Sequence, residues 1–296
     1  MSNAGLQPIT ITQRGLFEAA LSIQRRWSCE CNFVNLFAWS AVYDTVYAEI
    51  DGRLVVCNRH VNRLLFPFGE WFAPSELEAV RAALAVQTGL PLIWGDVPQE
   101  YIDAHDNALR PLYHVSTTPD EDDYLLLTAD VAALLGRDHQ NTRRLIRRFG
   151  ELTPGWRIVP ILPENQQAVF DLALRMQAEK DESEFSNNET VALKCAFDHF
   201  DALGLQGLIL TAADGGYLGF SAFSFTTPDV GNVHFEKAER LVTGAAQALR
   251  VGVAHHLSGR CTWMNLEQDM GNPGLRHSKR TYRPERMLPR YHLTPL

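Results

Sequence analysis

The sequence predicts an α/β (α+β) protein made of two domains of similar plan, each a mixed sheet flanked by helices. A chain of 296 residues is long enough for two domains of ordinary size. Its 46% apolar and 21% charged residues are typical of a folded, water-soluble protein. Strand-like and helix-like segments alternate throughout, and the Pro154-Gly155 pair breaks the pattern near the middle. We therefore expect one domain at residues 1–152 and a second at residues 153–296.

The first half is expected to begin with two helices and a hairpin. Asp51-Gly52 is a strong hairpin turn, because these residues adopt the positive φ angles that a two-residue turn requires. Pro74 opens a helix that stops before Gly89. The expected elements are helices at 13–24 and 32–40, strands at 45–50, 53–57 and 63–68, a helix at 74–87, strands at 91–94 and 124–128, and a helix at 132–149.

The second half has a clearer order of elements. We expect a strand at 157–162, a helix at 165–180, a polar stretch at 181–187, a helix at 189–203, strands at 208–210, 217–225 and 232–238, a helix at 244–257, a strand at 262–265, a helix at 273–282 and a strand at 287–293. This order is the plan of GNAT-type acyl-CoA N-acyltransferases, and the first half gives a reduced version of it. The prediction is a tandem of two GNAT-like domains.

Composition disfavours several classes of protein. No run approaches the roughly 20 apolar residues that a bilayer-spanning helix needs. The N-terminus lacks the basic-then-apolar plan of a secretory signal. The five cysteines are an odd number without the usual zinc-site spacing. We therefore expect free thiols in a reducing cytoplasm, no transmembrane segment and no metal site.

Charge is distributed unevenly along the chain. The 27 basic and 35 acidic residues argue against nucleic-acid binding through bulk charge. The helix expected at 132–149 nevertheless carries a local basic face. A solvated surface helix is the simpler interpretation, and contact with nucleic-acid phosphates is the functional one. The residues of this face are Arg143, Arg144, Arg147 and Arg148.

A polar strand near the C-terminus is the first candidate for catalysis. The segment 232–237 alternates, which predicts His234 and Glu236 on one strand face and Val233 and Phe235 on the other. A buried carboxylate needs partners or a proton. The pair is then either a satisfied ion pair with a nearby cation, or a general base with an orienting acid.

The next strand end and the helix after it supply further polar groups. Glu267 and Asp269 stand at the strand end, before a Gly-Asn-Pro-Gly turn that leads into a basic helix. Arg276 and Lys279 are three residues apart, so they share a helix face. Facing the acids, they form either a structural network or a binding site for a zwitterionic or anionic group. The predicted substrate-binding residues are Asn265, Glu267, Asp269, Arg276, Lys279 and Tyr282.

A CoA-binding loop is only partly present. In GNAT acetyltransferases the CoA pyrophosphate lies on backbone N–H groups at a helix start, in a Gln/Arg-x-x-Gly-x-Gly/Ala loop. Here Leu241-Val-Thr-Gly244-Ala-Ala246 keeps the Gly and the Ala but lacks the basic or amide residue at the first position. Gly244 and Ala246 are the predicted acyl-donor or phosphate loop.

Three motifs resemble the family of the C-terminal domain of phosphatidylglycerol lysyltransferases, a group of bacterial proteins. They are Phe33-Val-Asn35-Leu36-Phe37-Ala-Trp39 with Tyr47, His234-Phe-Glu-Lys-Ala238, and Asn265-Leu-Glu-Gln-Asp-Met-Gly271 followed by Gly274-Leu-Arg276-x-x-Lys279-x-x-Tyr282. The resemblance spans nearly the whole chain. It implies a tandem GNAT-like fold, in agreement with the order of elements.

The resemblance also implies transfer of an aminoacyl group from a charged tRNA to a lipid hydroxyl or an amine, as in the related Fem-type transferases. The basic helix would then meet tRNA. A CoA-dependent N-acetyltransferase that uses acetyl-CoA is the second hypothesis, and a non-catalytic module that binds a metabolite or a protein partner is the third. The family's lipid enzyme carries a long membrane-embedded portion, whereas this chain has none, so lipid is only one of the possible acceptors.

Overall fold

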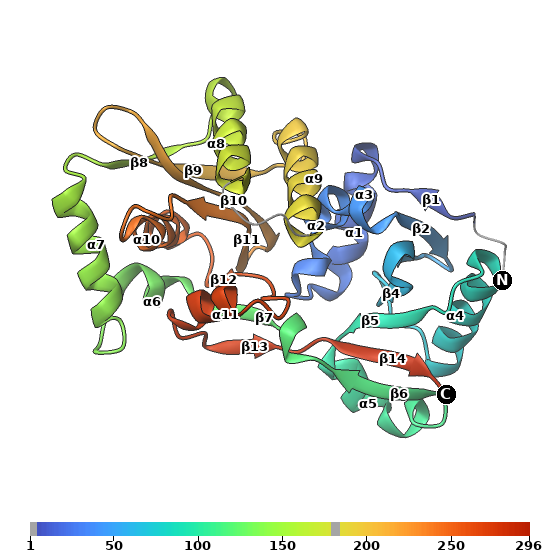
Figure 1. Cartoon of the computed structure of the whole chain (residues 1–296). Helices are drawn as coiled ribbons and strands as arrows, with labels where there is room; N and C mark the ends of the chain where they lie inside the picture. Colours follow the sequence, from blue (N-terminus) through green and yellow to red (C-terminus); the bar gives the residue numbers. More distant parts are fainter. Residues whose placement is uncertain (1–4, 179–183) are drawn as a thin grey trace.

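The computed structural model of the chain describes residues 5–178 and 184–296, whose strands form two seven-stranded sheets in an elongated molecule (Figure 1). In spatial order the first sheet contains β1 (Gln7–Pro8), β2 (Thr45–Ile50), β3 (Arg53–Asn58), β4 (Arg63–Leu65), β5 (Ile93–Val97), β14 (Tyr291–Pro295) and β6 (Tyr113–Thr117). The second contains β13 (Arg286–Leu288), β7 (Asp123–Leu127), β12 (Trp263–Asn265), β11 (Val230–Ala238), β10 (Tyr217–Thr227), β9 (Gln206–Thr211) and β8 (Arg157–Pro160).

Both sheets are mixed and flanked by helices, as predicted. β4 runs parallel to β5, and β11 runs parallel to β12, whereas the other described strand pairs are antiparallel. The α-helices are α1 (Arg14–Gln24), α2 (Phe33–Ala38), α3 (Ser40–Tyr43), α4 (Pro74–Thr88), α5 (Gln99–Leu109), α6 (Thr128–Ala133), α7 (Gln140–Leu152), α8 (Gln166–Ala178), α9 (Glu184–Asp198), α10 (Ala245–Leu257) and α11 (Pro273–Arg280).

The two sheets exchange strands across the boundary that we expected at residues 152 and 153. β7 lies in the first half of the sequence but pairs with β12 and β13 of the second sheet. β14, the last strand, lies between β5 and β6 of the first sheet. The division between the sheets therefore does not follow the Pro154-Gly155 break, because strand partners are chosen by long-range pairing that a local turn signal does not report.

The strand expected at 287–293 is two strands, one in each sheet. β13 ends at Leu288, and β14 begins at Tyr291. Pro289 has no N–H to donate to a ladder, and the Arg290 side chain is buried, with hydrogen bonds to the Glu121 backbone oxygen (2.8 Å) and the Glu30 carboxylate (2.9 Å). This break carries the chain from the second sheet to the first.

Several expected helices have different limits. The helix expected at 32–40 is α2, which ends at Ala38, followed by α3 from Ser40 to Tyr43. The helix expected at 132–149 is α6 and α7, separated where Leu134 and Gly136 have left-handed φ angles of 46° and 82°. The helix expected at 189–203 is α9, which begins at Glu184 and ends at Asp198. Of the helix expected at 165–180, α8 accounts for residues up to Ala178. Its last two residues, and 181–183 of the polar stretch, lie outside the described residues. α5 and β6 were not predicted, because α5 is largely polar and acidic and β6 (Tyr-His-Val-Ser-Thr) is a short segment without a continuous apolar run.

A shared hydrophobic core joins the two sheets. It combines Phe17 and Phe33 from α1 and α2 with Phe197 and Phe220 from α9 and β10. Figure 1 shows α2 and α9 side by side at the centre of the molecule. Each sheet has a further core of its own on its outer face. Because the central core draws on both halves of the chain, burial of its apolar surface holds α2 in fixed contact with β10 and β11.

Candidate active site

The second sheet forks between β11 and β12, and the fork holds a pocket of about 710 Å³. The two strands pair only over residues 230–232 and 263–265, after which β12 ends and β11 continues to Ala238. The pocket lies between this part of β11, the segment that follows β12, and α11. Of the predicted site residues, His234, Glu236, Glu267 and Lys279 line it.

A β-bulge at His234 changes the faces of the strand. Val233 pairs with Phe223 and Phe235 pairs with Ala222, so His234 is the extra residue in β11. Val233 therefore packs in the core beneath α10, whereas Phe235 packs in the central core. The prediction that His234 and Glu236 share a face is wrong for the same reason. A strictly alternating pattern does not reveal a bulge.

The two side chains consequently have different partners. The His234 side chain is fully buried and its Nδ1 lies 2.9 Å from Oδ1 of Asn35 on α2. Glu236 instead accepts a 2.7 Å hydrogen bond from Nε of Arg250 on α10, and both side chains are about 10% exposed. Glu236 is thus held in an ion pair, while His234 belongs to a network of neutral polar groups and one carboxylate.

Glu267 is that carboxylate. Its Oε1 accepts hydrogen bonds from Nδ2 of Asn35 (3.0 Å) and Nδ2 of Asn232 (2.7 Å) and lies 3.0 Å from Nδ1 of His234. The backbone of Glu267 has a φ of 60°, a left-handed conformation that is rare for residues other than glycine, and its N–H donates to Oδ1 of Asn265 at 2.6 Å. Strained backbone of this kind is found disproportionately at functional sites.

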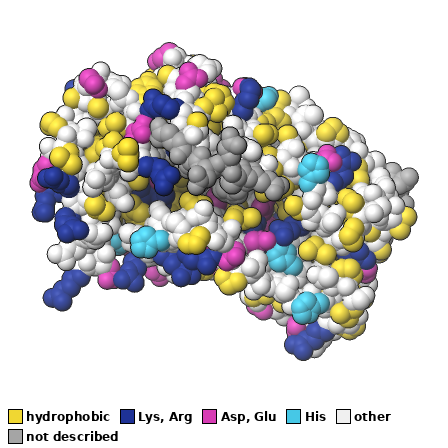
Figure 2. Space-filling model, in the orientation of Figure 1, with side chains coloured by type: hydrophobic (Ala, Val, Ile, Leu, Met, Phe, Trp, Pro, Cys, Tyr) yellow, Lys and Arg dark blue, Asp and Glu magenta, His cyan; other side chains and the backbone are white. Residues whose placement is uncertain are grey.

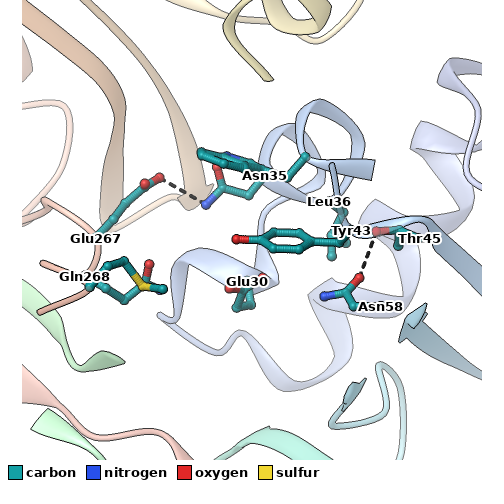
Figure 3. A pocket seen from close by; sticks show the side chains of 10 residues that line it. Glu30, Asn35, Leu36, Tyr43, Thr45, Asn58, Glu267 and Gln268 are labelled. Carbon is teal, nitrogen blue, oxygen red and sulfur yellow. Dashed lines mark hydrogen bonds between the residues drawn. The ribbon is translucent and has the colours of Figure 1, made fainter. Parts of the chain in front are cut away.

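Glu267 also lines a second, narrower pocket of about 90 Å³. Figure 3 shows the Glu267 carboxylate directed at the Asn35 amide, with the Tyr43 ring and Glu30 on the far side of this space. The N-terminal part of the chain thus contributes side chains from α2 and α3 to the surroundings of Glu267. The site is composite, which the sequence motifs alone did not indicate.

Lys279 of α11 is a buried cation in the fork whose pKa is lowered toward neutrality. Its Nζ donates to the backbone oxygen of Gln268 and lies 5.7 Å from the centre of the Tyr124 ring. Burial lowers the pKa of Lys279 to about 8, with the charge of Glu267 opposing this shift and that of Arg250 adding to it. A lysine with this pKa exchanges protons readily near neutral pH.

Asp269 and Arg276, both predicted to bind substrate, instead hold α11 in place. Asp269 is fully buried and accepts hydrogen bonds from Arg276 Nε (2.8 Å), Arg276 Nη2 (2.7 Å) and the Tyr124 hydroxyl (2.5 Å). Arg276 also reaches Asp120 at 2.5 Å. Burial tends to raise the pKa of Asp269, but its hydrogen bonds from Arg276, Tyr124 and the Gly271 amide outweigh this and lower the pKa to about 2.

Asn265 and Tyr282 are buried beside the fork. Nδ2 of Asn265 donates to Asp123 (2.9 Å) and to the Trp27 backbone oxygen (3.0 Å). The Tyr282 ring lies in the core beneath α10, and the Arg250 guanidinium lies 5.2 Å from its centre. Burial raises the pKa of Tyr282 to about 12. Neither Asn265 nor Tyr282 is among the described residues that line the fork pocket.

Gly244 and Ala246, the predicted phosphate loop, stand at the start of α10. Gly244 has a φ of 87°, and a Cβ there would lie 2.3 Å from the backbone oxygen of Leu145 in α7. The backbone of α7 therefore packs directly on this loop. Ala246 is exposed, and in the described lining of the fork pocket Arg240 is the residue nearest to this loop in sequence.

The four arginines of α7 are exposed, as the pattern predicts. Arg143 donates to the backbone oxygen of Leu134, which links α7 to the end of α6. Arg147 and Arg148 lie 3.8 and 3.6 Å from Glu151, and Arg144 donates to Asn141 at 3.0 Å. Figure 2 shows Lys and Arg side chains along the left edge of the molecule, where Figure 1 places α7.

Three polar residues that hold the site were not assigned from the sequence. Asn35 lies within the motif Phe33–Trp39, but the motif was given no role in the site. Asn232 stood at the start of the alternating strand, and Arg250 in an Ala-rich helix. A lone arginine on an otherwise apolar helix, like Arg250, is itself a signal of a buried partner. The role of Asn35 depends on contacts between residues more than 190 positions apart, which no local pattern reports.

Solved structures resemble the whole chain. A conserved protein of unknown function from Bacteroides thetaiotaomicron is 27% identical, with a TM-score of 0.91 over 99% of this chain and 100% of its own. The L-PGS of Bacillus licheniformis is 15% identical, with a TM-score of 0.66 over 98% and 93%. A tandem GNAT protein from the clavulanic acid biosynthesis pathway is 10% identical, with a TM-score of 0.51 over 98% and 98%. Among curated proteins, none matches the sequence.

The fold is the acyltransferase-like fold of a tandem GNAT protein. The family model of the phosphatidylglycerol lysyltransferase C-terminal domain matches residues 22–294, and the chain belongs to this family. Within residues 5–178 and 184–296, no helix has the length and apolar character needed to cross a membrane.

Proposed function

We propose that the protein transfers an aminoacyl group from an aminoacyl-tRNA to a lipid hydroxyl or an amine, at the fork of the second sheet. The observation that supports this most is the position of Glu267. Three side chains from α2 and β11 fix one of its oxygens, and its carboxylate lines the pocket. A carboxylate held in this way suits the ammonium group of an aminoacyl ester.

Lys279 is the proposed proton carrier. In its neutral form, Nζ takes the proton of the acceptor O–H or N–H as the acceptor attacks the ester carbonyl. The ester C–O bond then breaks, and the 3′ oxygen of the tRNA receives the proton from Lys279. Backbone N–H groups on the edge of β11 that β12 leaves open polarise the carbonyl. His234 orients Glu267, and the Glu236–Arg250 pair shapes the wall beside it.

The basic face of α7 is the proposed contact for tRNA. Arg147 is 74% exposed, with Glu151 at i,i+4 as its acidic neighbour. Arg110, on the first domain, is 73% exposed with Asp106 as an i,i+4 partner, so it is a matched control. If tRNA lies on α7, R147E weakens binding and lowers the slope of log K against log salt by about 1, whereas R110E leaves both unchanged. Equal effects of the two variants contradict this placement.

The decisive experiment is a transfer assay with tRNAs charged with a mixture of labelled amino acids and with lipid and peptide acceptors. We expect label on an acceptor with the unmodified protein and loss of at least 100-fold with E267Q. Acetyl-CoA is the competing acyl donor. The tandem GNAT fold is the observation that favours it. Thermal stabilisation by acetyl-CoA, with none from an aminoacyl-adenosine mimic, contradicts the aminoacyl-tRNA proposal.

A further inference from the structure

The buried ring of His234 has a second polar neighbour on the side opposite Glu267. Its Nε2 lies 2.7 Å from the hydroxyl oxygen of Ser224 on β10, and its Nδ1 lies 3.0 Å from Oε1 of Glu267. A serine, a histidine and a carboxylate are thus connected through the two ring nitrogens. This is the arrangement in which a histidine activates a serine as a nucleophile, and it is recognised by geometry rather than by sequence order.

The surrounding groups fix the ring in the tautomer that this chemistry needs. Nδ1 faces two acceptors, Oδ1 of Asn35 (2.9 Å) and Oε1 of Glu267, with Nδ2 of Asn232 (3.0 Å) as a competing donor. The Asn232 amide nitrogen donates to Glu267 at 2.7 Å, so it has an acceptor other than His234 Nδ1. A proton on Nδ1 leaves Nε2 unprotonated toward Ser224, so that His234 can accept the hydroxyl proton.

Ser224 opens onto a different space from the fork. It lines a groove of about 470 Å³ between α1, the start of α2 and the end of β10, with apolar walls from Leu21, Phe33 and Phe225. The fork pocket and this groove have no lining residue in common among the described residues. His234 therefore lies between two sites, with Glu267 facing one and Ser224 facing the other.

Asn32 donates a hydrogen bond to the Ser224 hydroxyl oxygen, the atom that gains negative charge as it loses its proton. Its Nδ2 donates to Ser224 Oγ at 2.9 Å, and its Oδ1 accepts the backbone N–H of Val34 at 2.9 Å and also lies 3.3 Å from Ser224 Oγ, farther than His234 Nε2 at 2.7 Å. Asn32 is buried, so this hydrogen bond is little weakened by solvent. A side-chain amide beside the nucleophile is a known form of oxyanion stabiliser.

We propose that Ser224, His234 and Glu267 form an esterase-type site that accepts small carboxylic esters from the α1 groove. His234 Nε2 takes the Ser224 hydroxyl proton as Oγ attacks the ester carbonyl, the ester C–O bond breaks, and the alcohol leaves with that proton. Water then attacks the acyl-serine through the same base and releases the acid. This activity shares His234 and Glu267 with the proposed aminoacyl transfer but requires neither tRNA nor the fork pocket.

Labelling with a fluorophosphonate probe tests the proposal without any natural substrate. We expect the folded chain to be labelled at Ser224, as located by peptide mass spectrometry, and to hydrolyse p-nitrophenyl acetate. S224A abolishes labelling at this position because the nucleophile is removed, and H234Q lowers the labelling rate by about 100-fold or more because the general base is removed. S221A is the matched control. Ser221 lies on the same strand, is fully buried, and its Oγ has no hydrogen-bond partner within the described chain. It should leave labelling unchanged.

A second variant separates loss of reactivity from loss of fold. S224C should be alkylated at residue 224 by iodoacetamide, and H234Q in the same background should slow this alkylation about 100-fold. Labelling at other serines only, or equal rates with and without the His234 imidazole, overturns the proposal. Because the probes do not involve tRNA, failure of aminoacyl transfer leaves this result intact, and the reverse also holds.

Discussion

The side-chain oxygen of Asn265 lies 2.6 Å from the backbone nitrogen of Glu267, two residues further along the chain. This hydrogen bond closes a tight turn at the end of β12 and holds Glu267 in its left-handed conformation. The Asn265 amide nitrogen is at the same time bonded to Asp123 of β7. The position of the candidate catalytic carboxylate is therefore set by a buried asparagine that does not line the pocket.

N265A should destabilise the protein and displace Glu267. The buried Asp123 carboxylate loses a donor, which costs about 1–3 kcal/mol in the free energy of unfolding. Urea denaturation followed by circular dichroism measures this change. N141A is the control, because Asn141 is exposed on α7 and its loss should change stability by less than about 0.5 kcal/mol. Similar values for both variants contradict a fixing role for Asn265.

D269N should mainly lower stability, whereas E267Q should mainly lower transfer activity. Asp269 is fully buried and pairs with Arg276, whose side chain is 33% exposed, so D269N weakens this partly exposed ion pair and costs about 1–3 kcal/mol of stability. Glu267 is partly exposed to the pocket, so E267Q should retain most of the stability and lose transfer activity. Denaturation curves measured beside the transfer assay separate the two. If D269N is stable but inactive, Asp269 binds substrate and its structural role is contradicted.

The low pKa of Asp269 predicts that the protein loses stability in acid. Its pKa in the folded chain is about 2, below the ordinary value of 3.8, so the folded state favours the ionised form. Stability from this group is present above pH 4 and is lost as the pH falls from about 4 to 2. D269N should therefore flatten this part of the stability curve, as measured by urea midpoints at a series of pH values. If the slope of the urea midpoint against pH is unchanged in D269N, that would falsify the assignment of this acid sensitivity to Asp269.

The lowered pKa of Lys279 predicts that stability also rises with pH in the alkaline range. Its folded pKa is about 8, below the ordinary 10.5, so the unfolded chain binds more protons between these values. Stability should rise as the pH increases from 8 toward 10.5, and K279M should remove that rise. If Lys279 carries the proton, kcat/KM of transfer should also increase with a midpoint near pH 8. A transfer profile that K279M leaves unchanged excludes Lys279 as the base.

G244A should be more harmful than an alanine at a glycine with open space. A Cβ at Gly244 meets the Leu145 oxygen at 2.3 Å, which forces α7 away from α10, and its positive φ adds strain. Gly259 also has a positive φ, of 77°, but a Cβ there meets nothing within 4 Å. We expect G244A to lose about 1–3 kcal/mol more than G259A, as measured by thermal unfolding. Equal losses show that the φ angle alone accounts for the effect.

The sequence by itself determined most of the local elements, the mixed-sheet architecture and the tandem GNAT-like plan. These follow from apolar periodicity, turn residues and the order of strands and helices, all of which are properties of neighbouring residues. It also indicated the region of the site, because Glu267 and Lys279 belong to one continuous motif.

Only the tertiary structure decided which residues face the pocket. The bulge at His234 separates it from Glu236, and the exchange of β7 and β14 between the sheets follows from pairing between distant strands. Asn35 and Ser224 meet at His234 from opposite sides, although 189 positions separate them in the chain (224 minus 35). Such contacts depend on how whole elements pack. A local pattern therefore located Glu267, and long-range packing determined what holds it.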